Sequence, residues 1–167
     1  MSVRPLTVED YDAWRTIRLE ALRDAPDAFL TTAAEEEARP TEDTHAFLAK
    51  GILYGAWDGS DLSGVMAMMP ETHDATRHRA WIVAVYVRPD WRGRSAADQL
   101  LMHVIALARA QGIAQLELHV SEGNARAIGF YQRHGFEICG RLPRAMRRDG
   151  RDIHELHMWR PLDTDEG

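Results

Sequence analysis

The sequence predicts an α/β protein, more closely an α+β arrangement, in which about seven strands form a mixed, mostly antiparallel sheet flanked by about four helices. Three observations lead to this fold class. Segments of period two alternate with segments of period 3.6, two neighbouring strands are joined by a short polar turn, and a later strand is apolar on both faces. With 167 residues, the chain is long enough for one buried core, so we expect a single domain over 1–167, with 163–167 as a disordered tail.

The first elements of the chain follow from local signals. Val3–Leu6 has the composition of a strand, and Thr7, with an acidic residue three positions later, has the pattern of a capping box. The helix that Thr7 begins should end near Asp24. A second helical stretch is expected over Ala33–Lys50, interrupted by Pro40 because proline lacks the N–H that a helix interior needs.

The middle of the chain predicts strands. Ile52–Trp57 and Leu62–Met69 flank the polar residues 58–61, which is typical of a β-hairpin. After the polar stretch 71–79, the segment Ala80–Val87 is apolar at both odd and even positions, as expected of a central strand buried on both faces.

The remaining elements alternate between helix and strand. Ser95–Gln111 carries apolar residues on one helical face, which predicts an amphipathic helix. A strand over Gln115–Val120 and a helix over Asn124–His134 should follow. Two further strands, Phe136–Arg141 and Ile153–Trp159, complete the expected sheet.

Composition limits the function classes. Hydrophobic residues make up 45% and charged residues 28% of the chain, and the formal net charge is −6, which disfavours general attraction to nucleic acid. No apolar run approaches the roughly 18 residues of a membrane span, and no signal peptide is recognisable, so we expect a cytoplasmic protein with no membrane partner. Cys139 is the only cysteine, which excludes an intramolecular disulfide; we expect it to be buried.

The turn after the central strand has the features of an anion site. Residues 88–97 are basic and small, and they lead directly into a predicted helix. The first N–H groups of a helix lack partners within it and lie at the positive end of its dipole, so they suit a pyrophosphate. Arg92 and Arg94 could add ion pairs. The segment lacks the Gly-Lys-Ser/Thr of a nucleotide-hydrolase P-loop.

This turn resembles the coenzyme A loop of the GCN5-related N-acetyltransferase (GNAT) family. The family pattern is Gln or Arg, two residues, Gly, one residue, then Gly or Ala. Here Arg92 takes the first place, Ser95 the place of the glycine, and Ala97 the last place. Serine leaves two outcomes open, because its hydroxyl could donate to the phosphate or its bulk could weaken binding.

A second segment is similar to another GNAT pattern, which is Asn, two residues, Ala, three residues, Tyr, and then Gly-Phe. Asn124, Ala127, Tyr131 and the pair Gly135-Phe136 occupy these places. Asn124 and Tyr131 are seven residues apart, about 20° from the same helical line, so they face one ligand. Taken singly, Asn124 fits an ordinary helix N-cap and Tyr131 a core aromatic.

The resemblance implies transfer of an acetyl group from acetyl-CoA to a primary amine, with a small molecule as the favoured acceptor and no metal. It implies parallel central strands, Ala80–Val87 and Gln115–Val120, that splay apart around the pantetheine arm. Tyr131 would protonate the leaving thiolate, because a phenol of pKa about 10 is protonated at neutral pH. The implied acetyl-CoA-binding residues are Val85, Val87, Arg92, Gly93, Arg94, Ser95, Ala96, Ala97, Asn124 and Ala127.

Several alternatives stay open at this point. The base that deprotonates the amine could be one of Glu35, Glu36 and Glu37, or Glu71, or His119, or a water relay. Competing functions are a non-catalytic acetyl-CoA-binding module and an acetyltransferase of protein or peptide N-termini. Family members are often dimers, and the oligomeric state is not predicted.

Two further patterns do not favour a ligand or metal site. A basic stretch, expected as a loop between the last two strands, favours a solvated hairpin over an anion site; it comprises Arg141, Arg144, Arg147, Arg148 and Arg151. His154 and His157 lie three apart on a strand, hence on opposite faces, so we expect no shared metal.

Overall fold

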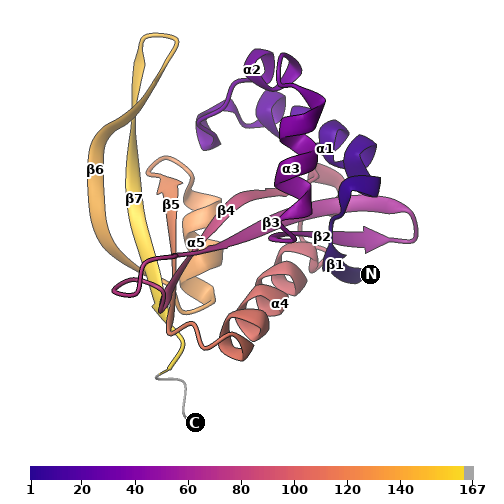
Figure 1. Ribbon diagram of the computed structural model, residues 1–167. Coiled ribbons are helices and arrows are strands. Elements are labelled where there is room, and N and C mark those ends of the chain that lie inside the picture. Colours follow the sequence, from indigo (N-terminus) through magenta and orange to yellow (C-terminus); the bar gives the residue numbers. More distant parts are fainter. Residues whose placement is uncertain (164–167) are drawn as a thin grey trace. The chain divides into compact units, whose positions relative to one another are not determined.

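The computed structural model describes residues 1–163, whose strands form one seven-stranded sheet (Figure 1). The strand order is β1-β2-β3-β4-β5-β7-β6. The β4–β5 pair is parallel, and the pairs β1–β2, β2–β3, β5–β7 and β6–β7 are antiparallel. The strands are β1 (Ser2–Pro5), β2 (Leu53–Asp58), β3 (Asp61–Pro70), β4 (Arg79–Val87), β5 (Gln115–Ser121), β6 (Glu137–Arg148) and β7 (Arg151–Pro161). The predicted mixed, mostly antiparallel sheet is therefore confirmed.

Within the described residues 1–163, five α-helices connect these strands: α1 (Tyr11–Asp24), α2 (Ala33–Glu37), α3 (Thr41–Ala49), α4 (Ala96–Ala110) and α5 (Ala125–Arg133). The stretch expected over residues 33–50 divides into α2 and α3 at Pro40, as its missing N–H requires. Within residues 1–163 no helix has the length and apolar composition that a membrane crossing requires. Apart from Asp163, the tail expected at 163–167 lies outside the described residues.

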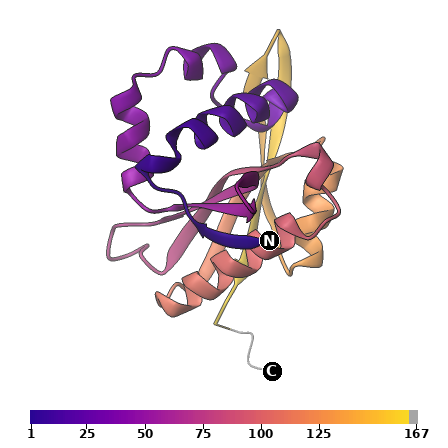
Figure 2. The same cartoon turned by 90° about the vertical axis from the view of Figure 1, so that its right-hand side faces the viewer.

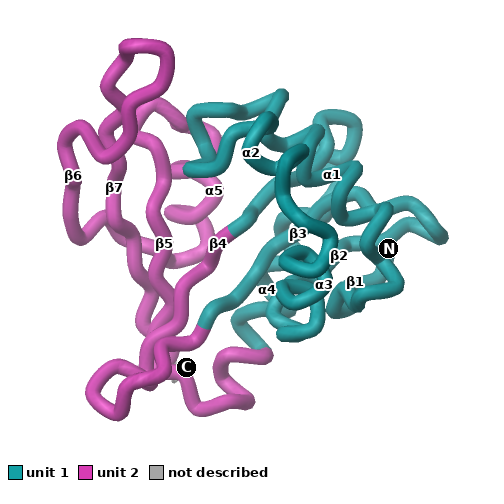
Figure 3. Tube along the Cα trace, turned by 45° about the horizontal axis from the view of Figure 1, so that its top comes forward, with its two compact units in different colours: residues 1–69, 84–106 teal, residues 70–83, 107–167 magenta. Residues whose placement is uncertain are grey.

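The chain forms two compact units that share strand β4 and helix α4 (Figure 3). Unit 1 comprises residues 1–69 and 84–106, and unit 2 comprises residues 70–83 and 107–167. The expectation of a single domain stays a prediction.

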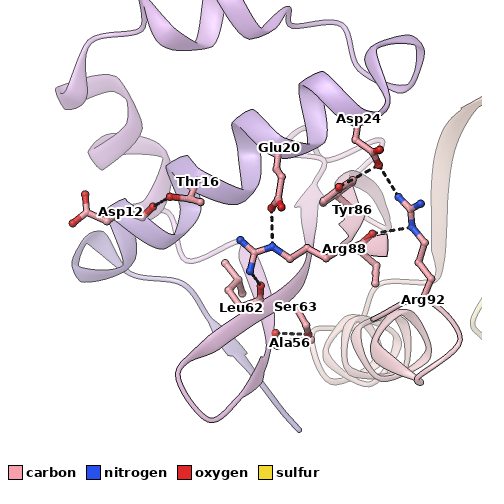
Figure 4. Close-up of polar contacts among 11 residues, drawn as sticks. Asp12, Thr16, Glu20, Asp24, Ala56, Leu62, Ser63, Tyr86, Arg88 and Arg92 are labelled. Atoms are coloured by element: carbon pink, nitrogen blue, oxygen red, sulfur yellow. Dashed lines mark hydrogen bonds and ion pairs between the residues drawn. The ribbon is translucent and has the colours of Figure 1, made fainter. Parts of the chain in front are cut away.

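In unit 1, α1 contacts both α2 and α3, and β1, β2 and β3 form an antiparallel ribbon. Arg88, the residue that follows β4, forms hydrogen bonds to both α1 and β3 (Figure 4). Its Nε donates to Glu20 of α1 at 2.7 Å, its Nη1 donates to the carbonyl of Leu62 at 2.8 Å, and its backbone N–H donates to Ser63. The exit of β4 is thereby fixed to α1 and to β3.

The apolar face of α4 is as predicted. Leu100, Leu101, Val104, Ile105 and Ala108 are each at most 2% exposed. Gly112, at φ 74°, follows the end of the helix in the left-handed conformation that glycine adopts without strain.

In unit 2 the chain ends with a long twisted hairpin, β6–β7, yellow in Figures 1 and 2. Its turn residues Asp149 and Gly150 both have positive φ, 51° and 74°, as a two-residue hairpin turn of the right twist requires. The expected loop of basic residues is therefore wrong: Arg141, Arg144, Arg147 and Arg148 belong to β6 itself, and Arg151 begins β7.

Two expectations about burial are also wrong. Cys139 is exposed, because β6 forms an edge of the sheet. Strand β4 is not buried on both faces: Ala80 and Ile82 are buried, whereas Trp81 and Val83, which alternate with them, are only half-buried. An apolar strand can therefore leave one face open to a ligand.

Candidate functional site

The loop that precedes α4 lies in unit 1 and contains two residues in the left-handed backbone conformation. Gly93 has φ 77° and Ser95 has φ 66°, after which α4 begins at Ala96. The first N–H groups of such a helix have no acceptor within it, so this turn can bind an anion. The φ of Ser95 also explains why the GNAT pattern has glycine there: a side chain in this conformation costs about 1–2 kcal/mol.

The side chain of Ser95 already has one partner. Its Oγ accepts a hydrogen bond from Gln99 Nε2 at 3.0 Å, one helical turn further on. A hydroxyl that accepts one hydrogen bond keeps its own proton for donation. Ser95 therefore retains the donor that a phosphate oxygen would need.

The two arginines of the loop differ in their surroundings. Arg92 Nη2 donates to the Asp24 carboxylate at 2.9 Å, its Nε donates to the Val87 carbonyl at 3.0 Å, and its guanidinium lies 5.7 Å from the ring centroid of Tyr86 (Figure 4). Arg94 lies over the indole of Trp91, 5.5 Å from the centroid. Arg92 thus holds the loop to α1 and β4, which sequence reasoning did not foresee.

Strand β4 carries a conformation that the sequence did not reveal. Ala84 has φ 54°, a left-handed residue inside a strand. Such residues cost of order 1–3 kcal/mol and concentrate at functional sites. Val85 and Val87, which follow it, are half-buried.

The second motif lies in unit 2 on α5. Asn124 is the N-cap, since its Oδ1 accepts the N–H of Ala127 at 3.2 Å. Tyr131 is 5% exposed and its ring meets the edges of Phe130 and Phe136. Burial raises the pKa of Tyr131 above its ordinary value, which keeps the phenol protonated. The structure thus supports the cap and core readings of these residues and leaves a role toward a ligand to be tested.

A polar face on unit 2 was missed by sequence reasoning. Along β5, Leu116, Leu118 and Val120 are buried on one face, so Glu117 and His119 lie on the other. His119 is paired across the strands with His157 of β7. Their rings lie 5.0 Å apart and 5.0 and 5.2 Å from the ring of Trp81 on β4. The alternation of polar and apolar residues over 115–121 indicates only the part of this face that lies on β5.

Glu117 is the buried anchor of the polar face. It is 3% exposed, it pairs through both carboxylate oxygens with Arg79, and it lies 2.9 Å from His157 Nε2. Burial acts to raise the pKa of Glu117, but the hydrogen bonds from Arg79, Gln115 and His157 outweigh it, so the pKa is lowered. Glu117 is therefore a carboxylate at neutral pH.

The acidic residues of α2 have structural partners in unit 1. Glu35 closes a capping box with Thr32, and Glu37 pairs with Arg23. Glu36 is 4% exposed and lies 3.2 Å from Arg39 and 3.8 Å from Arg18. These pairs account for the acidic segment without a ligand.

Most of the basic residues of β6 have acidic partners as well. Arg141 donates two hydrogen bonds to Glu122, and Asp152 pairs with both Arg144 and Arg147. His154 accepts a hydrogen bond from the backbone N–H of Arg144, whereas His157 contacts Glu117. The two histidines therefore have different partners. Among residues 1–163, no group of three or more His, Cys, Asp or Glu side chains is arranged to hold a metal ion.

Residues 11–136 match the model of the acetyltransferase (GNAT) family. The chain belongs to the GNAT family. The matched region contains the α4 loop and the Asn124–Tyr131 helix, so the resemblance that these two motifs indicated is confirmed.

Several curated acetyltransferases are similar to parts of this chain. The L-methionine sulfoximine/L-methionine sulfone acetyltransferase of Pseudomonas aeruginosa is 41% identical over 80 residues, which cover 48% of this chain and 46% of that protein. The first four curated relatives are each matched over less than half of their own length.

Two solved structures resemble the GNAT chain over nearly its whole length. The ribosomal-protein-alanine N-acetyltransferase of Brucella melitensis has a TM-score of 0.80 and 25% identity, covering 97% of this chain and 100% of that one. YncA of Salmonella typhimurium, solved with its cofactor acetyl-CoA, has a TM-score of 0.83 and 20% identity, covering 100% and 96%. At 20% identity the likeness to yncA establishes the fold.

Proposed function

We propose that the chain is an N-acetyltransferase that moves an acetyl group from acetyl-CoA to the primary amine of a small molecule. The observation that carries the proposal is the α4 loop, where Gly93 and Ser95 take the left-handed conformation directly before the helix. Membership of the GNAT family and the acetyl-CoA bound to yncA support the choice of ligand.

The α4 loop and strand β4 carry the first set of residues proposed to contact acetyl-CoA. In unit 1, the N–H groups of Gly93 and of residues 95–97 bind the pyrophosphate, whereas the backbone N–H of Arg94 donates to the Trp91 carbonyl at 3.2 Å. The Arg94 side chain adds charge and the Ser95 hydroxyl adds a donor. Arg92, held by Asp24, positions the loop. The backbone of Val85 and Val87 pairs with the pantetheine arm as an added strand would.

In unit 2, α5 supplies the remaining proposed contacts. Asn124 uses its Oδ1 for the helix cap, and its amide nitrogen is the donor for the coenzyme. Ala127 is small enough for close approach. Tyr131, whose pKa burial raises, is the acid for the departing sulfur.

The proposed reaction needs no protein nucleophile. The free amine attacks the thioester carbon, a C–N bond forms, and the oxyanion is stabilised by a backbone N–H of β4. The C–S bond then breaks. Counted from the ammonium form R–NH3⁺, nitrogen loses two protons: one leaves to solvent before attack, and sulfur gains one through Tyr131.

Two other functions remain as alternatives. The full-length likeness to an alanine N-acetyltransferase of a ribosomal protein supports a protein N-terminus as acceptor, whereas the methionine sulfoximine acetyltransferase supports a small amine. A non-catalytic acetyl-CoA-binding module would bind the coenzyme without turnover. Such a module would have no use for a proton donor at Tyr131.

The proposal is tested by thiol release from acetyl-CoA across a panel of L-methionine sulfoximine, spermidine, an aminoglycoside and an alanyl peptide. We expect acetyl-CoA to raise the melting temperature and one of the small amines to release thiol fastest. Fastest release with the alanyl peptide would favour the protein N-terminus. Thermal stabilisation without thiol release from any acceptor would favour the binding module.

A further inference from the structure

The polar face of unit 2 contains one imidazole that is both accessible and held in place. The side chain of His119 is 47% exposed. Its ring meets the indole of Trp81 edge to face and lies 5.0 Å from the ring of His157. A ring held from two neighbouring strands has few orientations, which is what a proton-transfer group requires.

A carboxylate faces one nitrogen of this imidazole. Nδ1 of His119 lies 3.6 Å from Oε2 of Glu155 on β7, whose side chain is 16% exposed. This distance is longer than a hydrogen bond, but the negative charge favours a proton on Nδ1. With the proton on Nδ1, Nε2 carries the lone pair and is the nitrogen that can accept a proton.

The other titratable groups around His119 are engaged. His157 directs Nε2 at the Glu117 carboxylate at 2.9 Å, and because Glu117 is ionised this nitrogen acts as a donor. Glu117 itself is held by Arg79 and is buried. Glu71 accepts the indole N–H of Trp81 at 2.8 Å.

The charge of this face suits an ammonium group. Glu71, Glu117 and Glu155 supply three carboxylates, and Arg79, which pairs with Glu117, lies over Trp81. A net negative local charge attracts a cationic amine. Proton transfer from that amine must occur before attack, since an alkyl ammonium has no lone pair.

We propose that His119 is the proton acceptor for the amine, with Glu155 as its positioning residue. This inference rests on the proposed acetyltransferase function. Nε2 of His119 takes one proton from R–NH3⁺, which leaves R–NH2 with the lone pair that forms the C–N bond. The imidazolium, next to Glu155, then releases this proton to solvent. Of the bases that the sequence left open, those of α2 and Glu71 have other partners.

The test compares wild type with His119→Gln and His119→Ala, with His78→Gln as the matched control because His78 is an exposed residue of the same unit. The readouts are the pH profile of kcat/KM for the best acceptor of the panel, acetyl-CoA binding by thermal shift, and rescue by imidazole. His119→Gln should lower kcat at pH 7 by about 10²-fold or more, while acetyl-CoA binding is unchanged.

The pH profile separates a base from a structural residue. Wild type and His78→Gln should share one profile that levels off below the amine's pKa of about 10, whereas His119→Gln should keep rising as free amine accumulates toward pH 10. Added imidazole should raise the rate of His119→Ala at least tenfold and leave wild type unchanged. Glu155→Gln should lower kcat less than His119→Gln and leave KM unchanged.

The outcomes separate the two proposals. If wild type turns over and His119→Gln keeps the wild-type pH profile with kcat within threefold, His119 is not the base and the acetyltransferase function stands. If wild type binds acetyl-CoA and releases no thiol with any acceptor, the acetyltransferase function fails and the role of His119 fails with it.

Discussion

Tyr86 donates a hydrogen bond to the carboxylate of Asp24, with 3.2 Å between the two oxygens. The bond joins β4 to the last residue of α1, and the same carboxylate binds Arg92, the first residue of the coenzyme A motif. Burial and the charge of Asp24 raise the pKa of Tyr86 to about 12. The loop proposed to bind acetyl-CoA is therefore anchored to the N-terminal helix within unit 1.

The raised pKa of Tyr86 predicts a loss of stability in alkali. Below pH about 10 the phenol is protonated in both the folded and the unfolded state, and its contribution is fully present. As pH rises from about 10 toward 12, only the unfolded phenol ionises, so stability falls. We expect Tyr86→Phe to lose about 1 kcal/mol less than wild type between pH 9 and pH 11 in urea unfolding. Equal losses would contradict the shift.

The left-handed conformation of Ser95 predicts an unusual order of stabilities. Ser95→Ala and Ser95→Gly both remove the hydrogen bond from Gln99, but only glycine relieves the strain at φ 66°. We expect the glycine variant to be the more stable of the two by about 1 kcal/mol in urea unfolding. In an ordinary helical position alanine is the more stable, and that order here would refute the assignment.

The acid role of Tyr131 predicts a defect in turnover alone. Tyr131→Phe keeps the ring contacts with Phe130 and Phe136 and removes the proton donor. We expect kcat to fall about 10²-fold and acetyl-CoA affinity to stay within a few-fold. Since burial raises the pKa of this phenol, the acid form persists, and kcat of wild type should show no decline due to Tyr131 up to pH about 10. Unchanged turnover in the variant would remove the acid role.

Glu117 predicts how stability responds to acid. Its folded pKa is lowered, so its contribution is present above the unfolded value of about 4.3 and is lost as pH falls below it. We expect Glu117→Gln to cost about 1–3 kcal/mol at pH 7, where Arg79 loses its partner, and less at pH 3.5. Glu137→Gln, an exposed change on β6, should be neutral within about 0.5 kcal/mol. A penalty for Glu117→Gln that does not shrink in acid would show that its ion pair is unimportant.

Elements defined by local pattern were predictable. The apolar stripe of α4, the β2–β3 hairpin and the division of residues 33–50 at Pro40 all follow from the period of the sequence or from one residue's geometry. The Asp149-Gly150 turn was predictable on the same basis, since this dipeptide favours hairpin turns. Because the prediction did not use this signal, the expected strands Phe136–Arg141 and Ile153–Trp159 are shorter than the observed β6 and β7.

Features that depend on distant partners were not predictable. The polar face joins Trp81, His119 and His157, which meet only because β5 lies between β4 and β7. The buried Glu36 likewise lies near Arg18, which precedes it by 18 residues in the sequence. The left-handed residues Ala84 and Ser95 are hidden because neither is glycine, the residue that signals such a conformation. Motif spacing therefore located the loop and α5 but not the strain, and it left His119 as one of several possible bases.

The most direct test of the proposed function follows the acetyl group itself. Wild-type protein is incubated with acetyl-CoA and the best small amine of the panel, and the acetylated amine is quantified by mass spectrometry beside the released thiol. The proposed transfer predicts one acetylated amine for each thiol, with both rates falling together in Tyr131→Phe. Thiol release without acetylated amine, or neither product despite binding of acetyl-CoA, would contradict it.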